Sequence, residues 1–297
     1  MNHTGFWLIT CLWLTFAATL SAQNTTHSQP IWQEIYTSIA QDYTEGNFGP
    51  DVQGDTLTLI KGDLRISGYG TANREFMNSI IKPALKPYQT ELARLPKLQL
   101  INTLAIIIFN SYQLYLGKEF YRWGGDLLDL DDPQSEGIRY QYRYGLDCSG
   151  FTVSAYELAV ELGMINADDP AALFSSSGYR NYCLNHQLRD KGGREGTPNR
   201  YRLDTSELVG LGREILAISQ NGILTPKDKK RLQAGDILGL NGHFGIIVEL
   251  EDGLYYLESG GWVVPPSGGK PAPIADAIKI FALKGALTIR RCLPDSE

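Results

Sequence analysis

Residues 144–152 read YGLDCSGFT, and residues 235–250 read GDILGLNGHFGIIVEL. In the first stretch, Cys148 stands between an Asp and a Ser-Gly pair, at the point where an apolar helical pattern begins. In the second stretch, His243 follows a Gly and opens a strand-like run of alternating residues. The two stretches raise one question: Cys148 and His243 are either a nucleophile and its base or two unrelated core residues.

Cys148 has a setting that suits a nucleophile. The thiolate is the reactive form, and an ordinary thiol with a pKa of about 8.5 is mostly protonated at neutral pH. A helix N-terminus and a nearby protonated His both favour the thiolate. Gly150 leaves room for a substrate backbone, and the N–H groups of the first helical turn suit an oxyanion. Most lone cysteines are buried and inert, but the polar neighbours of Cys148 argue against that alternative.

His243 is the preferred base among the histidines that follow the first 22 residues. His27 lies in a polar spacer, and His186 lies in a long connection, three residues after Cys183. Cys183 and His186 supply only two metal ligands, whereas a structural zinc ion takes four. We therefore expect no metal, and a position at the start of a strand would hold His243 rigidly.

Helical spacing dominates the first part of the chain, and alternation dominates the last part. Helices are predicted over 31–43, over 74–95 with interruptions at Pro83 and Pro87, over 97–116, from Cys148 to 163, and over 204–219. Strands are predicted as a pair within 54–70, as a hairpin of 243–250 and 254–259 around an EDG turn, and over 278–283 and 286–292. Helices that precede an antiparallel sheet favour the α+β class.

The composition is that of an ordinary soluble globular protein. The 297 residues are 43% hydrophobic and 20% charged, and the length alone favours about two domains. A net charge of −6 argues against nucleic acid as a partner, because such proteins usually carry a basic face. Residues 164–234 form a long connection with a local excess of Arg, which fits either a carboxylate-binding loop or a solvated surface loop.

The first 22 residues contain no Asp, Glu, Lys or Arg and end in small residues, as in a secretory signal peptide. We predict cleavage near Ala22 rather than an uncleaved anchor, because the apolar run is short for a membrane span. Residues 101–117 are apolar but contain two Asn residues, so they are predicted to form a buried helix. The mature chain is expected in the periplasm or outside the cell, without a stable membrane span.

Removing Cys11 with the signal leaves Cys148, Cys183 and Cys292. This odd number is compatible with a Cys183–Cys292 disulfide and equally with three reduced thiols, because pairing cannot be deduced from sequence alone.

Four motifs occur in a fixed order: YRWGG (121–125), DCSGF (147–151), GD (235–236) and HFGIIV (243–248). Together they resemble the NlpC-type cell-wall cysteine peptidases, over roughly residues 96–297. The resemblance implies a papain-like fold in which helices pack on an antiparallel sheet.

The same resemblance implies roles for individual residues. Cys148 would be the nucleophile and His243 the base, and Tyr121 would reach the active site. Asp147 and Ser149 would help to hold the free amino end of the peptide stem. Asp147 also fits a helix cap, and both roles are possible at once.

The sequence departs from the family pattern at two places. Only six residues separate Asp236 and His243, and the usual third polar residue, often His, must come from the strand after His243. A two-residue Asp252-Gly253 turn puts Glu258 on the same face as His243, whereas a three-residue EDG loop puts Ser259 there. We prefer Glu258, because a carboxylate can orient and charge an imidazole.

These observations predict an exported peptidoglycan hydrolase that cuts stem peptides between D-Glu and a diamino acid, commonly diaminopimelate, through an acyl-enzyme on Cys148. No cofactor is expected, and the sequence does not indicate an oligomeric state. A muramoyl-L-alanine cysteine amidase, a non-catalytic wall-binding module and a related acyltransferase are the alternatives. The predicted organisation is a signal peptide (1–22), an N-terminal region of unknown role (23–95), either separate or attached to the main domain, and a peptidase domain (96–297).

Overall fold

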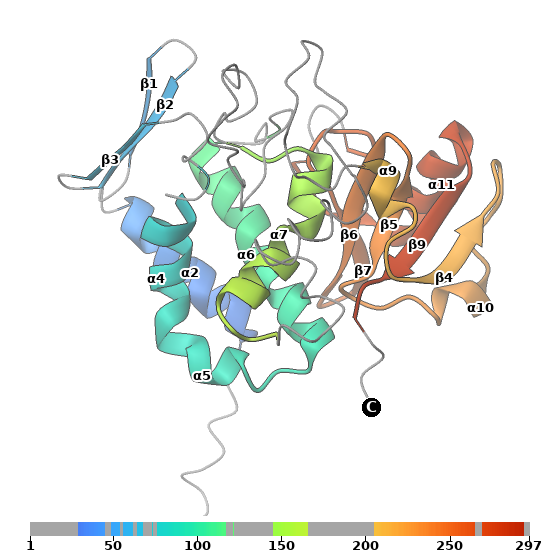
Figure 1. Cartoon of the computed structure of the whole chain (residues 1–297), viewed down its shortest axis with the longest axis horizontal. Helices are drawn as coiled ribbons and strands as arrows, with labels where there is room; N and C mark the ends of the chain where they lie inside the picture. The colour runs from blue at the N-terminus through green and yellow to red at the C-terminus, as the bar shows by residue number, and fades with distance from the viewer. Residues whose placement is uncertain are drawn as a thin grey trace, which may run out of the picture.

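The computed structural model of the chain has helices followed by an antiparallel sheet, which is the predicted α+β class (Figure 1). The structure describes residues 29–44, 49–53, 56–61, 64–67, 73, 76–116, 121, 145–165, 205–264 and 269–293. The predicted signal peptide and most of the Arg-rich connection lie outside these residues.

Helix α6 (Lys97–Leu116) is the centre of the helical half of the molecule. It was predicted over the same residues, and its apolar side chains are buried on several faces, which explains why it lacks a polar face. Helix α2 (Ile31–Thr44) packs on it through Ile35 and Ile39, two of the three apolar positions that predicted this helix.

The segment between these helices follows its two prolines. It runs through η1 (Met77–Ile81), α4 (Lys82–Leu85), η2 (Lys86–Tyr88) and α5 (Gln89–Leu92). Pro83 lies in the first turn of α4, and Pro87 lies in the 3-10 turn η2, so the helix is broken into short pieces as predicted. The buried residues of this segment share one hydrophobic core with α6, α7 and one face of the large sheet.

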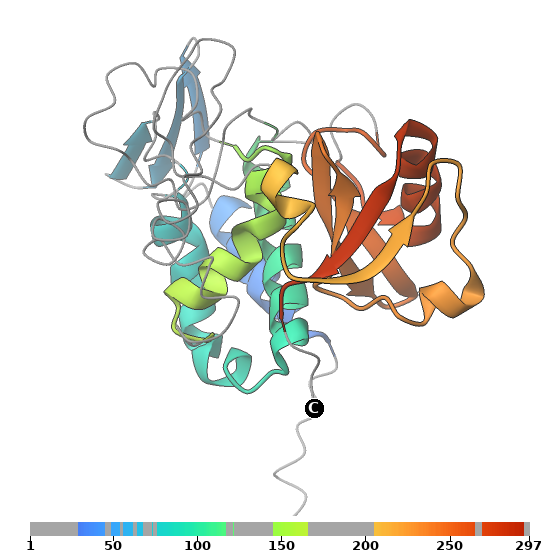
Figure 2. The same ribbon diagram turned by 45° about the vertical axis from the view of Figure 1, so that its right-hand side comes forward.

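A small antiparallel sheet precedes that segment. Its strands are β1 (Gly49–Gln53), β2 (Thr56–Lys61) and β3 (Leu64–Ser67), paired in that order. The predicted strand pair within 54–70 corresponds to β2 and β3. Figure 2 shows this sheet on the side of the helical half that faces away from the large sheet.

The large sheet has the strand order β4-β9-β5-β6-β7-β8, and all its neighbours are antiparallel. The strands are β4 (Arg213–Ile218), β5 (Ile237–Leu240), β6 (His243–Leu250), β7 (Gly253–Leu257), β8 (Ala272–Pro273) and β9 (Leu287–Arg291). Short helices α9 (Thr205–Leu208) and α10 (Pro226–Lys229) flank β4 in sequence.

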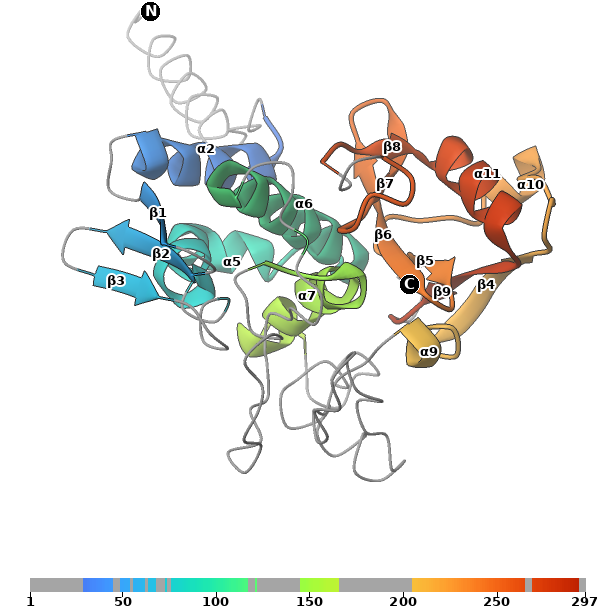
Figure 3. The same cartoon turned by 90° about the horizontal axis from the view of Figure 1, so that it is seen from above.

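Each face of the large sheet is covered by helices (Figure 3). Phe244, Ile246 and Val248 of β6 face α6 and α7 (Cys148–Glu161). Ile247, which lies between two of them in sequence, faces helix α11 (Ile274–Lys284) on the opposite side. Because β6 is covered on both faces, it is a nearly continuous apolar run.

Two of the predicted elements are wrong. The helix predicted over 204–219 is α9 followed by strand β4, because Gly210 and Gly212 end the helix and Arg213–Ile218 pairs with β9. The strand predicted over 278–283 belongs to helix α11. Its buried residues recur at helical spacing, and they cover the sheet (Ile274, Ala277, Ile278, Phe281).

Asn102 joins α6 to the large sheet, because its side chain makes the hydrogen bonds that a neighbouring strand would otherwise make. Strand β5 pairs with β6 only as far as Ile246, so the backbone of Glu249 has no strand neighbour on that side. The Asn102 side chain accepts a hydrogen bond from Glu249 N at 2.8 Å and donates one to Glu249 O at 3.3 Å. A side-chain amide offers the same donor and acceptor as a peptide group, so it satisfies this backbone.

Asp236 of the GD motif is held in a buried ion pair with Arg291 of β9. Arg291 donates from Nε to Oδ1 at 2.7 Å and from Nη2 to Oδ2 at 3.0 Å, and Asp236 is fully buried. Gln233 N also donates to Oδ2 at 2.9 Å. The GD motif therefore has a structural role, in which a two-pronged ion pair links the start of β5 to β9.

Candidate active site

Cys148 is the first residue of α7, and Asp147 is the cap of that helix. Asp147 Oδ1 accepts a hydrogen bond from Gly150 N at 2.8 Å and one from Ser149 Oγ at 3.0 Å. The cap satisfies an N–H of the first turn that has no partner within the helix. The structure thus gives Asp147 the cap role that the sequence allowed, and the predicted contact of Asp147 and Ser149 with substrate stays a prediction.

His243 and Glu258 form a buried pair. His243 Nε2 lies 2.6 Å from Glu258 Oε2, and the two residues are 2% and 0% exposed. The other oxygen, Oε1, accepts hydrogen bonds from Val263 N at 2.7 Å and Val264 N at 3.0 Å. A carboxylate can only accept, so Nε2 carries the hydrogen in this pair.

The strand register explains why Glu258 and not Ser259 reaches His243. Leu250 pairs with Gly253, so the turn between β6 and β7 is Glu251-Asp252 rather than the predicted Asp252-Gly253. The pairing moves by two residues, which leaves the face of every side chain unchanged. Glu258 therefore lies on the same face as His243, as the two-residue turn predicted.

Ser259 points to the other side and has a different contact. Its hydroxyl donates to the backbone oxygen of Leu146 at 2.6 Å. Leu146 also forms a parallel bridge with Tyr121. Ser259 thus ties the end of β7 to the segment that leads into Cys148, and Tyr121 is joined to the same segment.

Tyr121 and His243 meet at Gly260. A Cβ atom built on Gly260 would lie 2.9 Å from His243 Cε1 and 3.3 Å from two ring atoms of Tyr121. Tyr121, His243 and Glu258 are therefore close neighbours, and the Ser259–Leu146 bond ties the end of β7 to the residue two positions before Cys148. The rest of the YRWGG motif lies outside the described residues.

An aromatic stack covers His243. Its ring lies parallel to that of Trp262, with centroids 4.8 Å apart and an angle of 10°, and Phe281 lies 6.0 Å away. Lys284 Nζ lies 4.2 Å from the ring of Trp262. The stack restricts rotation of the imidazole and excludes water from its pair with Glu258. Trp262 could not be recognised from the sequence, because an isolated Trp after a Gly pair gives no signal of a site.

Tyr256 is a second residue that could not be recognised from the sequence. It is buried, and its hydroxyl has no hydrogen-bond partner among the described residues. Burial raises the pKa of Tyr256 well above its usual value, and the Glu258 carboxylate and the Cys148 thiol raise it further. Tyr256 is therefore close enough to Cys148 and Glu258 for their charges to act on it.

The described residues hold no group of three or more His, Cys, Asp and Glu side chains that could bind a metal ion. Cys292 is a buried, free thiol, which favours the reduced alternative over a Cys183–Cys292 disulfide. Cys183 and His186 lie outside the described residues. Among the helices that the structure describes, none has the length and hydropathy needed to cross a bilayer.

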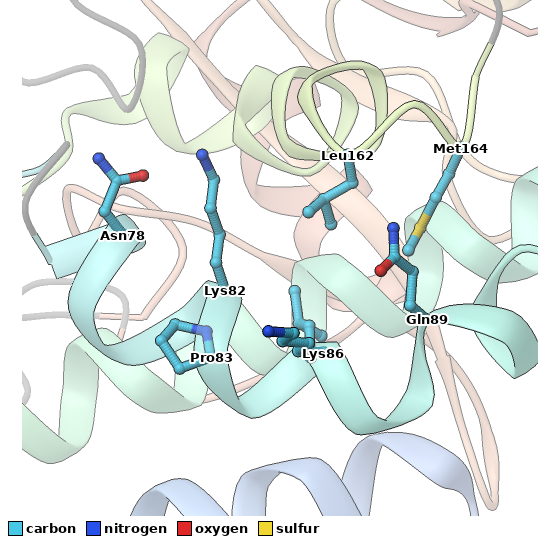
Figure 4. Close-up of a pocket in the computed structure, with 8 residues that line it drawn as sticks. Asn78, Lys82, Pro83, Lys86, Gln89, Leu162 and Met164 are labelled. Carbon is cyan, nitrogen blue, oxygen red and sulfur yellow. The ribbon is translucent and has the colours of Figure 1, made fainter.

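A cavity of about 400 Å³ lies at the other end of α7 (Figure 4). Its lining is both apolar and polar, and the lining residues are Asn78, Lys82, Pro83, Leu85, Lys86, Gln89, Leu162 and Met164. Lys82 is already paired with Glu161. A 14-residue helix is about 20 Å long, so this cavity is separate from the site around Cys148.

No protein-family model matches the chain. No curated protein and no solved structure matches it either.

Proposed function

We propose that this chain is an exported peptidoglycan hydrolase, a cysteine endopeptidase of the NlpC type with a papain-like fold. The observation that carries the proposal is the buried His243–Glu258 pair, which Gly260 and Ser259 connect to the segment that leads into Cys148. Burying a His and a carboxylate costs free energy unless the two are paired, and such a pair suits the activation of a cysteine nucleophile.

The hydrogen bond to Glu258 assigns the two ring nitrogens. Nε2 is held by the carboxylate, so Nδ1 is the nitrogen that exchanges a proton with Cys148. Glu258 orients the ring and stabilises the imidazolium that forms. The two N–H groups of Val263 and Val264 fix the carboxylate in turn.

The reaction proceeds through two displacements at one carbonyl carbon. Nδ1 of His243 takes the thiol proton while Sγ of Cys148 attacks the carbonyl carbon, and N–H groups at the start of α7 stabilise the oxyanion. The C–N bond then breaks, and the leaving amine takes the proton from Nδ1. Water attacks the thioester and gives its proton to Nδ1; the C–S bond breaks, and the thiolate regains a proton from Nδ1.

The proposed substrate is a peptidoglycan stem peptide, cut between D-Glu and diaminopimelate. Tyr121 lies near His243 at Gly260, which supports the proposal that it reaches the active site. Asp147 and Ser149 sit at the start of α7, where they hold the amino end of the stem in this proposal.

Mass spectrometry of muropeptides tests the proposal. The mature chain and its Cys148→Ala variant are incubated with purified stem peptides and with intact sacculi. New fragments with a free diaminopimelate amine, absent with the variant, support the peptidase. Free stem peptides that begin at L-Ala would indicate an amidase instead. Binding to sacculi without any cleavage would contradict the enzyme and favour a wall-binding module.

A further inference from the structure

Asn73 makes an unusual set of contacts for a residue in a region without recognisable chemistry. It is 3% exposed, and its side-chain amide pairs with both backbone groups of Gly145. Asn73 Nδ2 donates to Gly145 O at 2.9 Å, and Gly145 N donates to Asn73 Oδ1 at 3.0 Å. Gly145 is itself buried, so without Asn73 its backbone would lose both partners.

The two bonds to Gly145 fix the orientation of the Asn73 amide, because a flipped amide would point its NH2 group at Gly145 N, and two donors would face each other. The hydroxyl of Tyr112, on α6, adds a third bond and donates to Asn73 Oδ1 at 2.9 Å. Tyr112 is fully buried and packs edge-on against Phe76, with centroids 4.9 Å apart. The amide is therefore held rigidly.

Gly145 starts the short segment that delivers Cys148. Its φ of 132° lies in a range that favours glycine, so the chain changes direction here. Leu146 follows, held by Ser259 and Tyr121, and Asp147 then caps α7. Three residues before the thiol, the position of the backbone thus depends on one amide that lies 72 positions earlier in the sequence.

We propose that Asn73 is a positioning residue for Cys148, so that the region before residue 96 is an integral part of the active site. The inference rests on the proposed role of Cys148 as the nucleophile. Asn73 acts through Gly145 and does not touch substrate. When its amide is removed, the start of α7 shifts relative to His243 and Tyr121, and a small misplacement of a reacting group reduces the rate strongly.

The test compares Asn73→Ala with Asn102→Ala in the full mature chain. Asn102 is the matched control, because its amide makes the same two backbone bonds, to Glu249, at the far end of β6. Three quantities are measured: the pH profile of Cys148 alkylation by iodoacetamide, followed by mass spectrometry of that cysteine; kcat and KM on muropeptides; and the thermal unfolding midpoint.

Both variants are expected to unfold at a lower temperature, because each loses two backbone partners. Only Asn73→Ala should change the chemistry, with alkylation of Cys148 at pH 7 slower by about tenfold and kcat lower by about tenfold to a hundredfold. KM should stay within about threefold, since the binding groups remain. A folded Asn73→Ala protein with the wild-type alkylation profile and kcat would overturn the inference.

Tyr112→Phe serves if Asn73→Ala does not fold. It removes only the hydroxyl that bonds to the amide, and it should lower kcat and slow alkylation in the same direction by a smaller factor; unchanged values would overturn the inference. If the wild-type chain cleaves no muropeptide, the alkylation profiles still decide the role of Asn73. The failure of the proposed function is thereby distinguished from the failure of this inference.

Discussion

Glu258 is fully buried, so water does not screen the charge of its carboxylate. Its two oxygens face different partners: Oε2 faces His243, and Oε1 faces Val263 N and Val264 N. All three partners are donors, so the position requires a side chain that accepts at both ends. A carboxylate meets this requirement, and an amide does not.

Glu258→Gln is therefore expected to reduce kcat by about a hundredfold or more. If the amide turns its NH2 group to His243, Nε2 must accept and Nδ1 carries the hydrogen, so it cannot take the thiol proton. If the amide turns the other way, its NH2 group faces two N–H donors. Steady-state kinetics measure the effect, with Glu249→Gln, an exposed residue near the end of β6, as the control; equal kcat values for both variants would contradict the role of Glu258.

Gly260 is expected to be intolerant of a side chain for reasons of space. Gly260 and Gly253 both have a positive φ, of 126° and 143°. A Cβ atom at Gly253, however, meets nothing within 4 Å. A Cβ at Gly260 would press on His243 and Tyr121. Gly260→Ala should lower kcat by about tenfold or more, whereas Gly253→Ala should cost only stability. Kinetics and thermal unfolding of the two variants separate the effect of backbone strain from the displacement of His243 and Tyr121.

At the scale of residues, the sequence predicts those site residues that their immediate neighbours indicate. Cys148 and His243 are predicted site residues from their neighbours, and their catalytic roles stay predictions. The pairing of Glu258 with His243 is confirmed, because strand alternation preserves its face through a two-residue shift of register. Asn73, Tyr256 and Trp262 were missed, because nothing near them in the sequence indicates that they meet Gly145, Glu258 or His243. Their roles depend on contacts between segments far apart in the chain.

At the scale of elements, the Asp236–Arg291 pair fastens β9 to the start of β5. Breaking a buried ion pair leaves one charge without compensation, which typically costs about 3–5 kcal/mol. Arg291→Met should therefore lower the free energy of unfolding by about that amount. The double variant with Asp236→Asn should recover part of the loss, as measured by urea denaturation; a double variant less stable by the sum of both single losses would contradict a compensated pair.

Helices and strands are predictable from the sequence where a segment shows only helical spacing or only alternation. They are not where both patterns occur in the same segment. The apolar residues of α6 and α2 predicted both helices closely. The segment 204–219 contains a short helix and a strand separated by two glycines, and helical spacing was extended across the break. The run IKIFAL (278–283) fits a strand or a helix, because short apolar runs occur in both. Only the packing of α11 on the sheet decides for the helix.

At the scale of the whole molecule, the burial of Cys292 makes stability depend on alkaline pH. Burial, with a smaller effect of the nearby Asp236 carboxylate, raises the pKa of the Cys292 thiol from 9.0 to about 12. The folded state therefore holds this proton after the unfolded chain has lost it, so the contribution to stability is complete below pH 9 and falls between pH 9 and 12.

Between pH 8 and pH 10, this thiol is expected to cost the folded state about 1 kcal/mol. Urea denaturation at the two pH values measures the change. Cys292→Ala should be less stable at pH 8, because a buried side chain is truncated, yet it should lose less stability on going to pH 10. An equal loss in both proteins would mean that Cys292 does not titrate on unfolding.

The α+β class was predicted correctly, because helical spacing and alternation separate along the chain. The sequence does not predict that the first helices share a core with α6, α7 and the sheet, because an apolar face does not indicate which element it packs against. The same limit applies to the candidate site, whose residues are found by pattern and whose support comes from the folded chain.

The strand order has a consequence for the timing of folding. Strand β9 follows the other five strands of the large sheet in sequence, yet it lies between β4 and β5. A chain still being synthesised makes β4 through β8 before this strand exists, so two edges of the sheet stay open, and open edges can pair with other chains. The sheet can close only after residue 291 has been added. The large sheet therefore assembles only after all of its other strands have been made.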